Sequence, residues 1–317
     1  MSSAISSKAF LILFLMVGIG VGGGVSYAAY TFLTPQLNQQ PSQYTVVDDL
    51  GNVIIITHQP ERVVSLASAA TITLYNLSVY DRVVGIDKWI TDPVLQEGKV
   101  ICGSAYSPNI EAILNVTPDL VITWWYSEGK LDEVEAAGIP IVYIHPQSIE
   151  GILRDIELIG NVMNTTQTSN NLVALLRYQL DFMADFVDNM TDNYEKPNVY
   201  VELKTEYKSC GRDTFTSEMI EFAGGVNIAA NLTGYPILGD EYIINANVSI
   251  ILYENEAFTE SDFALRPGWD TIPAITDHKV YYLNDDIATA SPRFIEGLKF
   301  MIECFWNTTL ELPESLP

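Results

Sequence analysis

The stretch from Ile149 to Asn193 reads IEGILRDIELIGNVMNTTQTSNNLVALLRYQLDFMADFVDNMTDN. Its apolar residues recur every three to four positions, both before and after a polar break over residues 164–170. This spacing predicts helices with one apolar stripe and no strand. The second helix would run for roughly 20–25 residues, or about 30–37 Å, because each residue adds about 1.5 Å. We therefore expect a stiff helical connector over residues 151–196, which Pro197 ends.

Short apolar segments alternate with helical ones on both sides of this connector. The expected strands lie at residues 44–47 and 53–57, as an opening hairpin, and at 62–66, 83–86, 120–123, 141–144, 199–203, 250–253 and 280–283. The expected helices include residues 69–77, 110–114 and 131–137. Such alternation favours βαβ units and parallel sheets. The predicted fold is α/β, with two Rossmann-like lobes at 45–150 and 197–317 joined by one long rigid helix.

Residues at the expected element boundaries support this division. Ser107-Pro108 predicts a helix start, since serine caps helices and proline suits the first helical position. Gly138 and the Gly224-Gly225 pair predict helix ends, where glycine permits a positive φ. Asp119, between a proline and a strand, is expected to be a turn residue rather than a ligand.

The N-terminal segment predicts export from the cytoplasm. One basic residue, Lys8, precedes an apolar run over 9–33 that is long enough to span a bilayer, which takes about 20 residues. Two interpretations remain open: a membrane anchor over 1–33 that is retained, or a signal peptide cleaved after Ser26-Tyr27-Ala28. Residues 34–44 are polar and contain proline, which predicts a short linker.

The charge of the chain excludes one class of function. Its 317 residues include 40 acidic and only 16 basic side chains, a formal net charge of −24. The acidity comes from scarce lysine and arginine, which fall well below their usual share. No basic stripe is present to neutralise phosphates, so the composition excludes a nucleic-acid-binding protein. With 48% hydrophobic residues the chain can bury a large core, which excludes intrinsic disorder.

Asn-x-Ser/Thr sequons are more frequent than chance predicts. Seven occur, where random placement gives about 2.6. They begin at Asn76, Asn115, Asn164, Asn189, Asn231, Asn247 and Asn307. We expect surface glycosylation of an exported chain. The three cysteines, Cys102, Cys210 and Cys304, have no metal-ligand spacing, and both three free thiols and one disulfide with a free thiol remain open. A lipid-modified cysteine near the N-terminus is excluded, because Cys102 is the first.

Four motifs carry a resemblance to a known family. They are Asn109-Ile110-Glu111-Ala112-Ile113-Leu114 with Thr117-Pro118-Asp119-Leu120-Val121-Ile122, Ala137-Gly138-Ile139-Pro140-Ile141, Glu221-Phe222-Ala223-Gly224-Gly225-Val226-Asn227-Ile228, and Ala290-Ser291-Pro292-Arg293. In their order and spacing, over residues 44–307, the sequence resembles the class III (helical-backbone) substrate-binding proteins of ABC importers. This family includes periplasmic cobalamin-binding, ferric-siderophore-binding and haem-binding proteins, which hold their ligand in a cleft between two lobes.

The resemblance assigns two exposed carboxylates to docking. It implies that Glu111 and Glu221, one in each lobe, bind arginines of the transmembrane permease. Such charge pairs mainly set register and on-rate. Two alternatives stay open: Glu111 only stabilises the helix N-terminus near which it lies, and Glu218 replaces Glu221.

Aromatic residues follow several expected strands of the first lobe. In an open α/β sheet, ligands bind outside the carboxyl ends of the strands. The candidates for ligand binding are Trp89, Tyr106, Trp124, Trp125, Tyr126 and, in the second lobe, Tyr235. Flat aromatic walls suit a planar macrocycle or a catecholate chelate. The resemblance supports Trp89, Trp124 and Tyr235, whereas Trp125 alone has core packing as an equal alternative.

The second lobe supplies scarce basic residues near the expected cleft. The loop 204–212 contains Tyr207 and Arg212, and Arg293 opens the last helix. If the ligand is anionic, these arginines together with Lys204 and Lys208 are the expected counter-charges; for Tyr207 and Lys208 an ordinary solvated loop is the alternative. The segment 286–289 departs from the cobalamin-binding pattern, because it is shorter and lacks an aromatic residue and an arginine. This puts cobalamin in doubt and leaves haem or a ferric chelate open.

The expected function is therefore capture without catalysis. The chain would be a monomeric extracellular receptor without a resident cofactor, which delivers a metal chelate to an ABC permease and its ATPase. Free metal-ion binding is disfavoured, because the three histidines are scattered. Two other functions stay open: a cell-surface structural glycoprotein, and an exported α/β enzyme without a recognisable catalytic motif.

Overall fold

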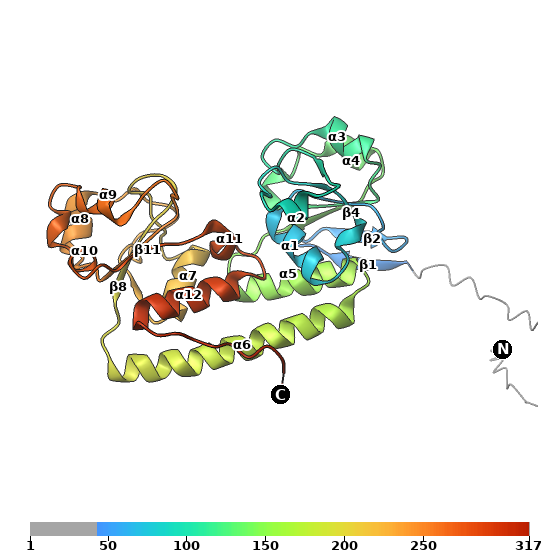
Figure 1. The fold of residues 1–317 in the computed structure, drawn as a ribbon. Helices are drawn as coiled ribbons and strands as arrows, with labels where there is room; N and C mark the ends of the chain where they lie inside the picture. The colour runs from blue at the N-terminus through green and yellow to red at the C-terminus, as the bar shows by residue number, and fades with distance from the viewer. Residues whose placement is uncertain (1–42, 317) are drawn as a thin grey trace, which may run out of the picture. The chain divides into compact units, whose positions relative to one another are not determined.

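The computed structural model describes residues 43–316, apart from the side chains of Asp285 and Asp286 (Figure 1). The N-terminal segment expected over 1–33 and nearly all of the expected linker over 34–44 lie outside the described residues. Within the described range, no helix is both long and apolar enough to cross a membrane.

The first lobe is built on a five-stranded parallel sheet, with the order β5-β4-β3-β6-β7. Its strands are β3 (Val63–Ser65), β4 (Val83–Ile86), β5 (Val100–Ile101), β6 (Leu120–Trp124) and β7 (Ile141–Ile144). An antiparallel hairpin of β1 (Tyr44–Val47) and β2 (Val53–Ile56) precedes it. The helices are α1 (Ser68–Asn76), η1 (Tyr80–Arg82), α2 (Pro93–Gln96), α3 (Ile110–Asn115), η2 (Trp125–Ser127) and α4 (Asp132–Ala136). The central strands are apolar and buried, as expected for a parallel sheet covered on both faces.

The second lobe contains a four-stranded parallel sheet, with the order β11-β10-β8-β9. Its strands are β8 (Asn198–Glu202), β9 (Val226–Asn227), β10 (Ile250–Tyr253) and β11 (Val280–Tyr282). Its helices are α7 (Phe215–Phe222), α8 (Asp240–Asn245), α9 (Glu260–Ala264), η3 (Trp269–Thr271), α10 (Pro273–Thr276), α11 (Asp285–Ala288) and α12 (Phe294–Trp306). Alternate residues of β8 serve two apolar clusters, because strand side chains alternate in direction. Val199 and Val201 join the cluster with α12, whereas Tyr200 packs with Trp269.

Two helices, α5 (Ile149–Val162) and α6 (Thr166–Asn193), connect the lobes and pack against each other (Figure 1). The apolar stripe of α6 is buried against α5 and the second lobe. The expected polar break over 164–170 is wrong in length, because α6 already begins at Thr166. The polar residues that follow belong to the exposed side of that helix, apart from the buried Ser169. The expected α/β fold with a helical connection is confirmed, whereas α6 has 28 residues and is longer than the roughly 20–25 expected, because its first turn consists of polar residues that the apolar periodicity does not report.

The structure corrects some local predictions and supports others. Ser107-Pro108 does not begin a helix; α3 begins at Ile110, and the Asn109 side chain caps it by accepting a hydrogen bond from Ala112 N at 3.1 Å. Gly138 and Gly224 adopt positive φ after α4 and α7, as expected. The strands β5 and β9 are not predicted, because two residues carry no periodicity.

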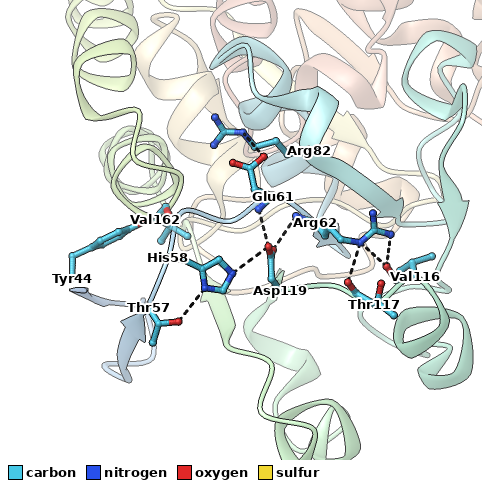
Figure 2. Close-up of polar contacts among 10 residues, drawn as sticks. All are labelled: Tyr44, Thr57, His58, Glu61, Arg62, Arg82, Val116, Thr117, Asp119 and Val162. Atoms are coloured by element: carbon cyan, nitrogen blue, oxygen red, sulfur yellow. Dashed lines mark hydrogen bonds and ion pairs between the residues drawn. The ribbon is translucent and has the colours of Figure 1, made fainter. Parts of the chain in front are cut away.

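Asp119 acts as a turn residue at the amino ends of the strands (Figure 2). Its carboxylate accepts hydrogen bonds from the backbone N–H groups of Glu61 and Arg62 at 2.8 and 2.9 Å, where the chain enters β3. The Arg62 guanidinium in turn donates to the carbonyls of Val116 and Thr117 at the end of α3. These bonds satisfy polar groups on loops that enter two neighbouring strands.

Candidate ligand-binding site

Four aromatic rings of the first lobe gather at the carboxyl end of β6. Tyr106 stacks on Tyr126, with ring centroids 4.1 Å apart and planes at 19°. Trp125 meets Tyr126 edge to face at 4.8 Å and Trp124 at 6.1 Å. Offset stacks and edge contacts are the favoured geometries for aromatic pairs. We call Tyr106, Trp124, Trp125, Tyr126 and His145 the aromatic platform.

His145 belongs to the platform although the sequence did not mark it as a ligand-site residue. It follows β7 directly, and its ring stacks on Trp125 with centroids 3.8 Å apart and planes at 22°. Its backbone N–H donates to the Asp49 carboxylate at 2.5 Å, which ties it to the opening hairpin. The rule that ligands bind beyond strand carboxyl ends would have identified this residue, because it follows a strand just as Trp125 does.

The platform is held by its strands but remains open to solvent. Trp124 is the last residue of β6 and packs against the apolar clusters on both faces of the sheet. Trp125 and Tyr126 lie in η2, where Trp125 is 36% exposed, and Tyr106 is 68% exposed. Burial, followed by the effects of Tyr106 and Asp87, raises the pKa of the Tyr126 hydroxyl. The packing of Trp124 in the lobe therefore holds the exposed rings of Trp125 and Tyr106 in position.

Two lysines flank exposed aromatic rings in the first lobe. The Lys130 ammonium lies 5.6 Å from the Tyr106 centroid and 5.8 Å from that of Tyr126. Lys88 lies 4.8 Å from the ring of Trp89, which is 65% exposed. Such cation–π contacts contribute about 0.5–1 kcal/mol at exposed sites.

Trp89 is positioned by a buried acid that the sequence did not mark. The Asp87 carboxylate follows β4 and accepts a hydrogen bond from Trp89 N at 2.7 Å. Burial raises the pKa of Asp87 to about 6, although this hydrogen bond, one from Ala105 and the nearby Lys88 charge act in the opposite direction. The Asp87 carboxylate therefore fixes the turn in which the exposed Trp89 indole lies.

In the second lobe, Tyr235 is the exposed aromatic residue of the candidate site. Its ring is 58% exposed, and the Lys208 ammonium lies 5.5 Å from its centroid. Backbone pairing between Lys208 and Ile237 joins the two loops that carry these residues. The pKa of Tyr235 is raised by burial first and then by nearby groups, of which one is Tyr106 of the first lobe.

The Tyr207 ring packs against other side chains of its own lobe. Its ring lies 4.6 Å from the Arg266 guanidinium carbon and 6.1 Å from the Trp269 ring. Arg266 also forms two hydrogen bonds, at 2.6 and 2.7 Å, with the fully buried carboxylate of Glu202. Sequence reasoning missed this pair, because 64 residues separate its members. The Tyr207 ring is therefore held within the second lobe by Arg266 and Trp269.

The two arginines proposed from the sequence differ in their surroundings. Arg212 is exposed, and its guanidinium makes no hydrogen bond or ion pair with any residue that the structure describes. Arg293 is half-buried and pairs with Glu296 in the first turn of α12, with a separation of 2.9 Å. Arg212 is therefore the more available cation.

The two docking candidates are exposed, and a competing acid is not. Glu111 lies in the first turn of α3, and Glu221 lies near the end of α7. Glu218 instead accepts a hydrogen bond from Ile149 N at 2.9 Å, at the start of α5. Burial raises the pKa of Glu218, as does the neighbouring Glu221. This contact leaves Glu221 as the available carboxylate on α7.

The cysteines are free thiols, two of them buried and Cys304 partly so. Burial raises the pKa of Cys102 to about 11 and those of Cys210 and Cys304 to about 12, so all three are protonated at neutral pH. Over residues 43–316 no group of three or more His, Cys, Asp or Glu side chains is arranged to hold a metal ion.

Comparisons with known proteins agree with this arrangement. The chain is 28% identical over 274 residues to an uncharacterized ABC transporter substrate-binding lipoprotein of Bacillus subtilis. This alignment covers 84% of this chain and 86% of the relative. It is also 28% identical over 279 residues to a cobalamin-binding protein of Halobacterium salinarum. That alignment covers 84% of this chain and 75% of the relative.

A solved structure shares the fold. The periplasmic haem-binding protein of Roseiflexus sp. RS-1 superposes with a TM-score of 0.70 at 24% identity, covering 78% of this chain and 98% of that one. A family model described as periplasmic binding protein matches residues 63–287. The chain belongs to the periplasmic binding protein family.

Proposed function

We propose that this chain is the substrate-binding component of an ABC importer. In this role it captures a metal chelate, which is cobalamin, haem or a ferric siderophore, between its two lobes and delivers it to the permease. The observation that carries the proposal is the aromatic platform at the carboxyl edge of the first sheet. The relatives named as substrate-binding and cobalamin-binding proteins support the same role.

The platform suits a large ligand with a flat or apolar face. Exposed indole and phenol rings leave apolar surface in water, and covering it contributes roughly 25 cal/mol per Å². Tyr106 and Trp125 are exposed members of the platform, and Trp89 is a further exposed ring among the candidates of the first lobe. Tyr235 with Lys208 forms a second wall, and the available guanidinium of Arg212 suits an anionic group of the ligand.

The proposal includes partners and a location. Glu111 and Glu221 bind arginines of the permease, which works with an ATPase. The chain lies outside the cytoplasmic membrane, held by its N-terminal segment or released after cleavage. It acts as a monomer, without catalysis and without a resident cofactor.

The test is a titration of tryptophan fluorescence with cyanocobalamin, haemin and a ferric catecholate siderophore. We expect saturable quenching by one of the three, since Trp125 and Trp89 lie at the site. Trp125→Ala should weaken that binding at least tenfold, whereas Tyr194→Ala should not. Tyr194 is also an exposed aromatic residue, but it lies at the end of α6. Quenching by none of the chelates, or equal effects of the two variants, would contradict the proposal.

A further inference from the structure

The seven sequon asparagines share a chemical environment. Every one is exposed, and within residues 43–316 none uses its side-chain amide in a hydrogen bond. The seven are Asn76, Asn115, Asn164, Asn189, Asn231, Asn247 and Asn307. An acceptor amide must be reachable from solvent and free of competing bonds. All seven satisfy that requirement.

Most other asparagines of the described chain do not have a side-chain amide that is both exposed and free of hydrogen bonds. Asn52, Asn193 and Asn198, for example, donate their side-chain amides to protein oxygens. Asn227 is buried and donates to Cys210 O and Ser217 Oγ, both at 2.8 Å. A free exposed amide is therefore not a general property of asparagine in this protein.

Five of the seven lie at helix C-termini. Asn76 and Asn115 are the last residues of α1 and α3. Asn164, Asn247 and Asn307 adopt positive φ of 56°, 50° and 47° just beyond α5, α8 and α12. Asparagine tolerates this left-handed conformation, which commonly ends helices.

Helix C-termini lie at a defined edge of a parallel α/β lobe. Each strand ends at the carboxyl edge, and the helix that follows returns the chain to the amino edge. Asn76, Asn115 and Asn247 precede β4, β6 and β10, respectively, so they lie at the amino edges of their sheets. Asn307 ends α12, which follows β11. The aromatic platform lies at the opposite, carboxyl edge.

The remaining sequons lie near the same edges. The carbonyl of Met163, beside Asn164, accepts a hydrogen bond from Arg82, which immediately precedes β4. Asn231 lines a cavity of about 740 Å³ together with Asn198, the first residue of β8.

Asn189 lies on the last part of α6. Its neighbours Val187 and Thr191 approach Gly224, two residues before β9. The seven sequons thus lie on segments at or next to the amino edges.

We infer that these seven asparagines are acceptor sites for N-linked glycans, and that the glycans cover the amino edges of both sheets. In each transfer the amide Nδ2 forms a bond to the anomeric carbon of a lipid-phosphate-linked glycan. The bond from that carbon to the phosphate oxygen breaks, the phosphate leaves as an anion, and the amide loses one proton. The carboxyl edge, with the aromatic platform, stays bare for a ligand. The inference rests on the proposed export of the chain and is independent of the ligand.

The experiment is glycopeptide mass spectrometry on the full-length protein purified from the membranes of the cells that make it. We expect peptides with the seven sequons to carry added sugar masses. Fragmentation of the peptides that Asn170 and Asn245 share with sequon asparagines should place no sugar on these two residues, although they are exposed and have amides that are free within the described chain. They are the controls, because they share exposure and a free amide with the seven but lack a sequon; Asn245, the last residue of α8, also shares the helix C-terminal position of Asn76 and Asn115.

Two variants assign the masses to single sites. Thr233→Ala and Ser249→Ala remove the sequons of Asn231 and Asn247 and leave those asparagines in place. Each should remove one glycan from the intact mass, whereas Asn245→Gln should remove none. Unmodified masses for the seven peptides, or sugar on Asn170 or Asn245 as well, would overturn the inference. Neither result bears on chelate binding, so failure of this inference is distinguishable from failure of the proposed function.

Discussion

At the scale of single residues, Asp155 has a carboxyl group whose surroundings disfavour its charged form. Its carboxyl group is 5% exposed on α5, and its Oδ2 has no hydrogen-bond partner. Burial first, and then the neighbouring Asp49, raise its pKa to about 9. In an unfolded chain the pKa of aspartate is about 3.9. Because the folded pKa is the higher one, the stability contribution of Asp155 is complete below about pH 4 and is lost as the pH rises toward 9.

Asp155→Asn should therefore stabilise the protein at neutral and alkaline pH. The amide keeps the shape of the carboxyl group and carries no charge. We expect the gain in free energy of unfolding to rise from near zero at pH 4 to about 5 kcal/mol at pH 8, because each pKa unit corresponds to about 1.4 kcal/mol. Urea denaturation of both proteins at pH 4, 6 and 8 measures it. A gain that does not change with pH would show that the charge of Asp155 is not its cause.

The Glu202–Arg266 pair gives a second prediction at this scale. Removing only the cation, as in Arg266→Met, leaves the fully buried Glu202 carboxylate without its partner. We expect a loss of about 3–5 kcal/mol in the free energy of unfolding. The double variant E202Q/R266M should recover most of it, since no charge remains buried. Urea denaturation checks both, and a double variant as unstable as the single one would contradict the explanation.

At the scale of elements, the contact between α5 and α6 depends on one glycine. A Cβ atom at Gly160 would lie 2.1 Å from Ser169 Oγ and 2.3 Å from Ser169 Cβ. The small residue thus lets the two helices approach closely where the chain reverses. The same requirement explains why a helix-weakening residue occupies the interior of α5.

Gly160→Ala should separate these helices and destabilise the protein by about 1–3 kcal/mol, the usual cost of overpacking. Exchanging the two residues, as in G160A/S169G, removes the obstructing side chain and should restore part of the loss. Thermal unfolding of the unaltered protein, G160A and G160A/S169G measures the loss of stability and its recovery. If the exchange restores nothing, the close approach is not the source of the destabilisation.

At the scale of the whole molecule, the net charge of −24 gives the surface many acids, of which two are assigned to docking. Glu111 and Glu221 lie on different lobes, so two contacts would set the orientation of the receptor on its permease. Charge pairs at the rim of an interface act mainly on association and register. Glu218 is the less available carboxylate on α7, because it accepts a hydrogen bond from the backbone of α5.

The double variant E111A/E221A should abolish transport and leave ligand affinity within a few-fold. Uptake of the bound chelate in cells with the cognate importer, together with fluorescence titration, measures both. The control is E241A/E256A, which removes the same charge from exposed positions in the second lobe. A large loss of affinity in the docking variant, or an equal loss of uptake in the control, would contradict the docking role.

Much of this arrangement could be predicted from the sequence, because it depends on local patterns. The apolar periodicity over 149–193 determined the helical connector, and the alternation around it determined two α/β lobes. Aromatic residues directly after strands could be assigned to the carboxyl edge, since that position follows from chain direction alone. Trp125 and Tyr106 are exposed there.

Only the tertiary structure decided which of these residues are available. It stacks His145 on Trp125, uses Tyr207 to pack Arg266, and ties Glu218 to the start of α5. The physical reason is sequence separation: the partners lie far apart along the chain, and no local periodicity reports on them. The sequence by itself determined the fold class and the helical connector, and it assigned the proposed ligand site to the carboxyl edge. The side chains that are free to act at that edge were decided by contacts that exist only once the chain has folded.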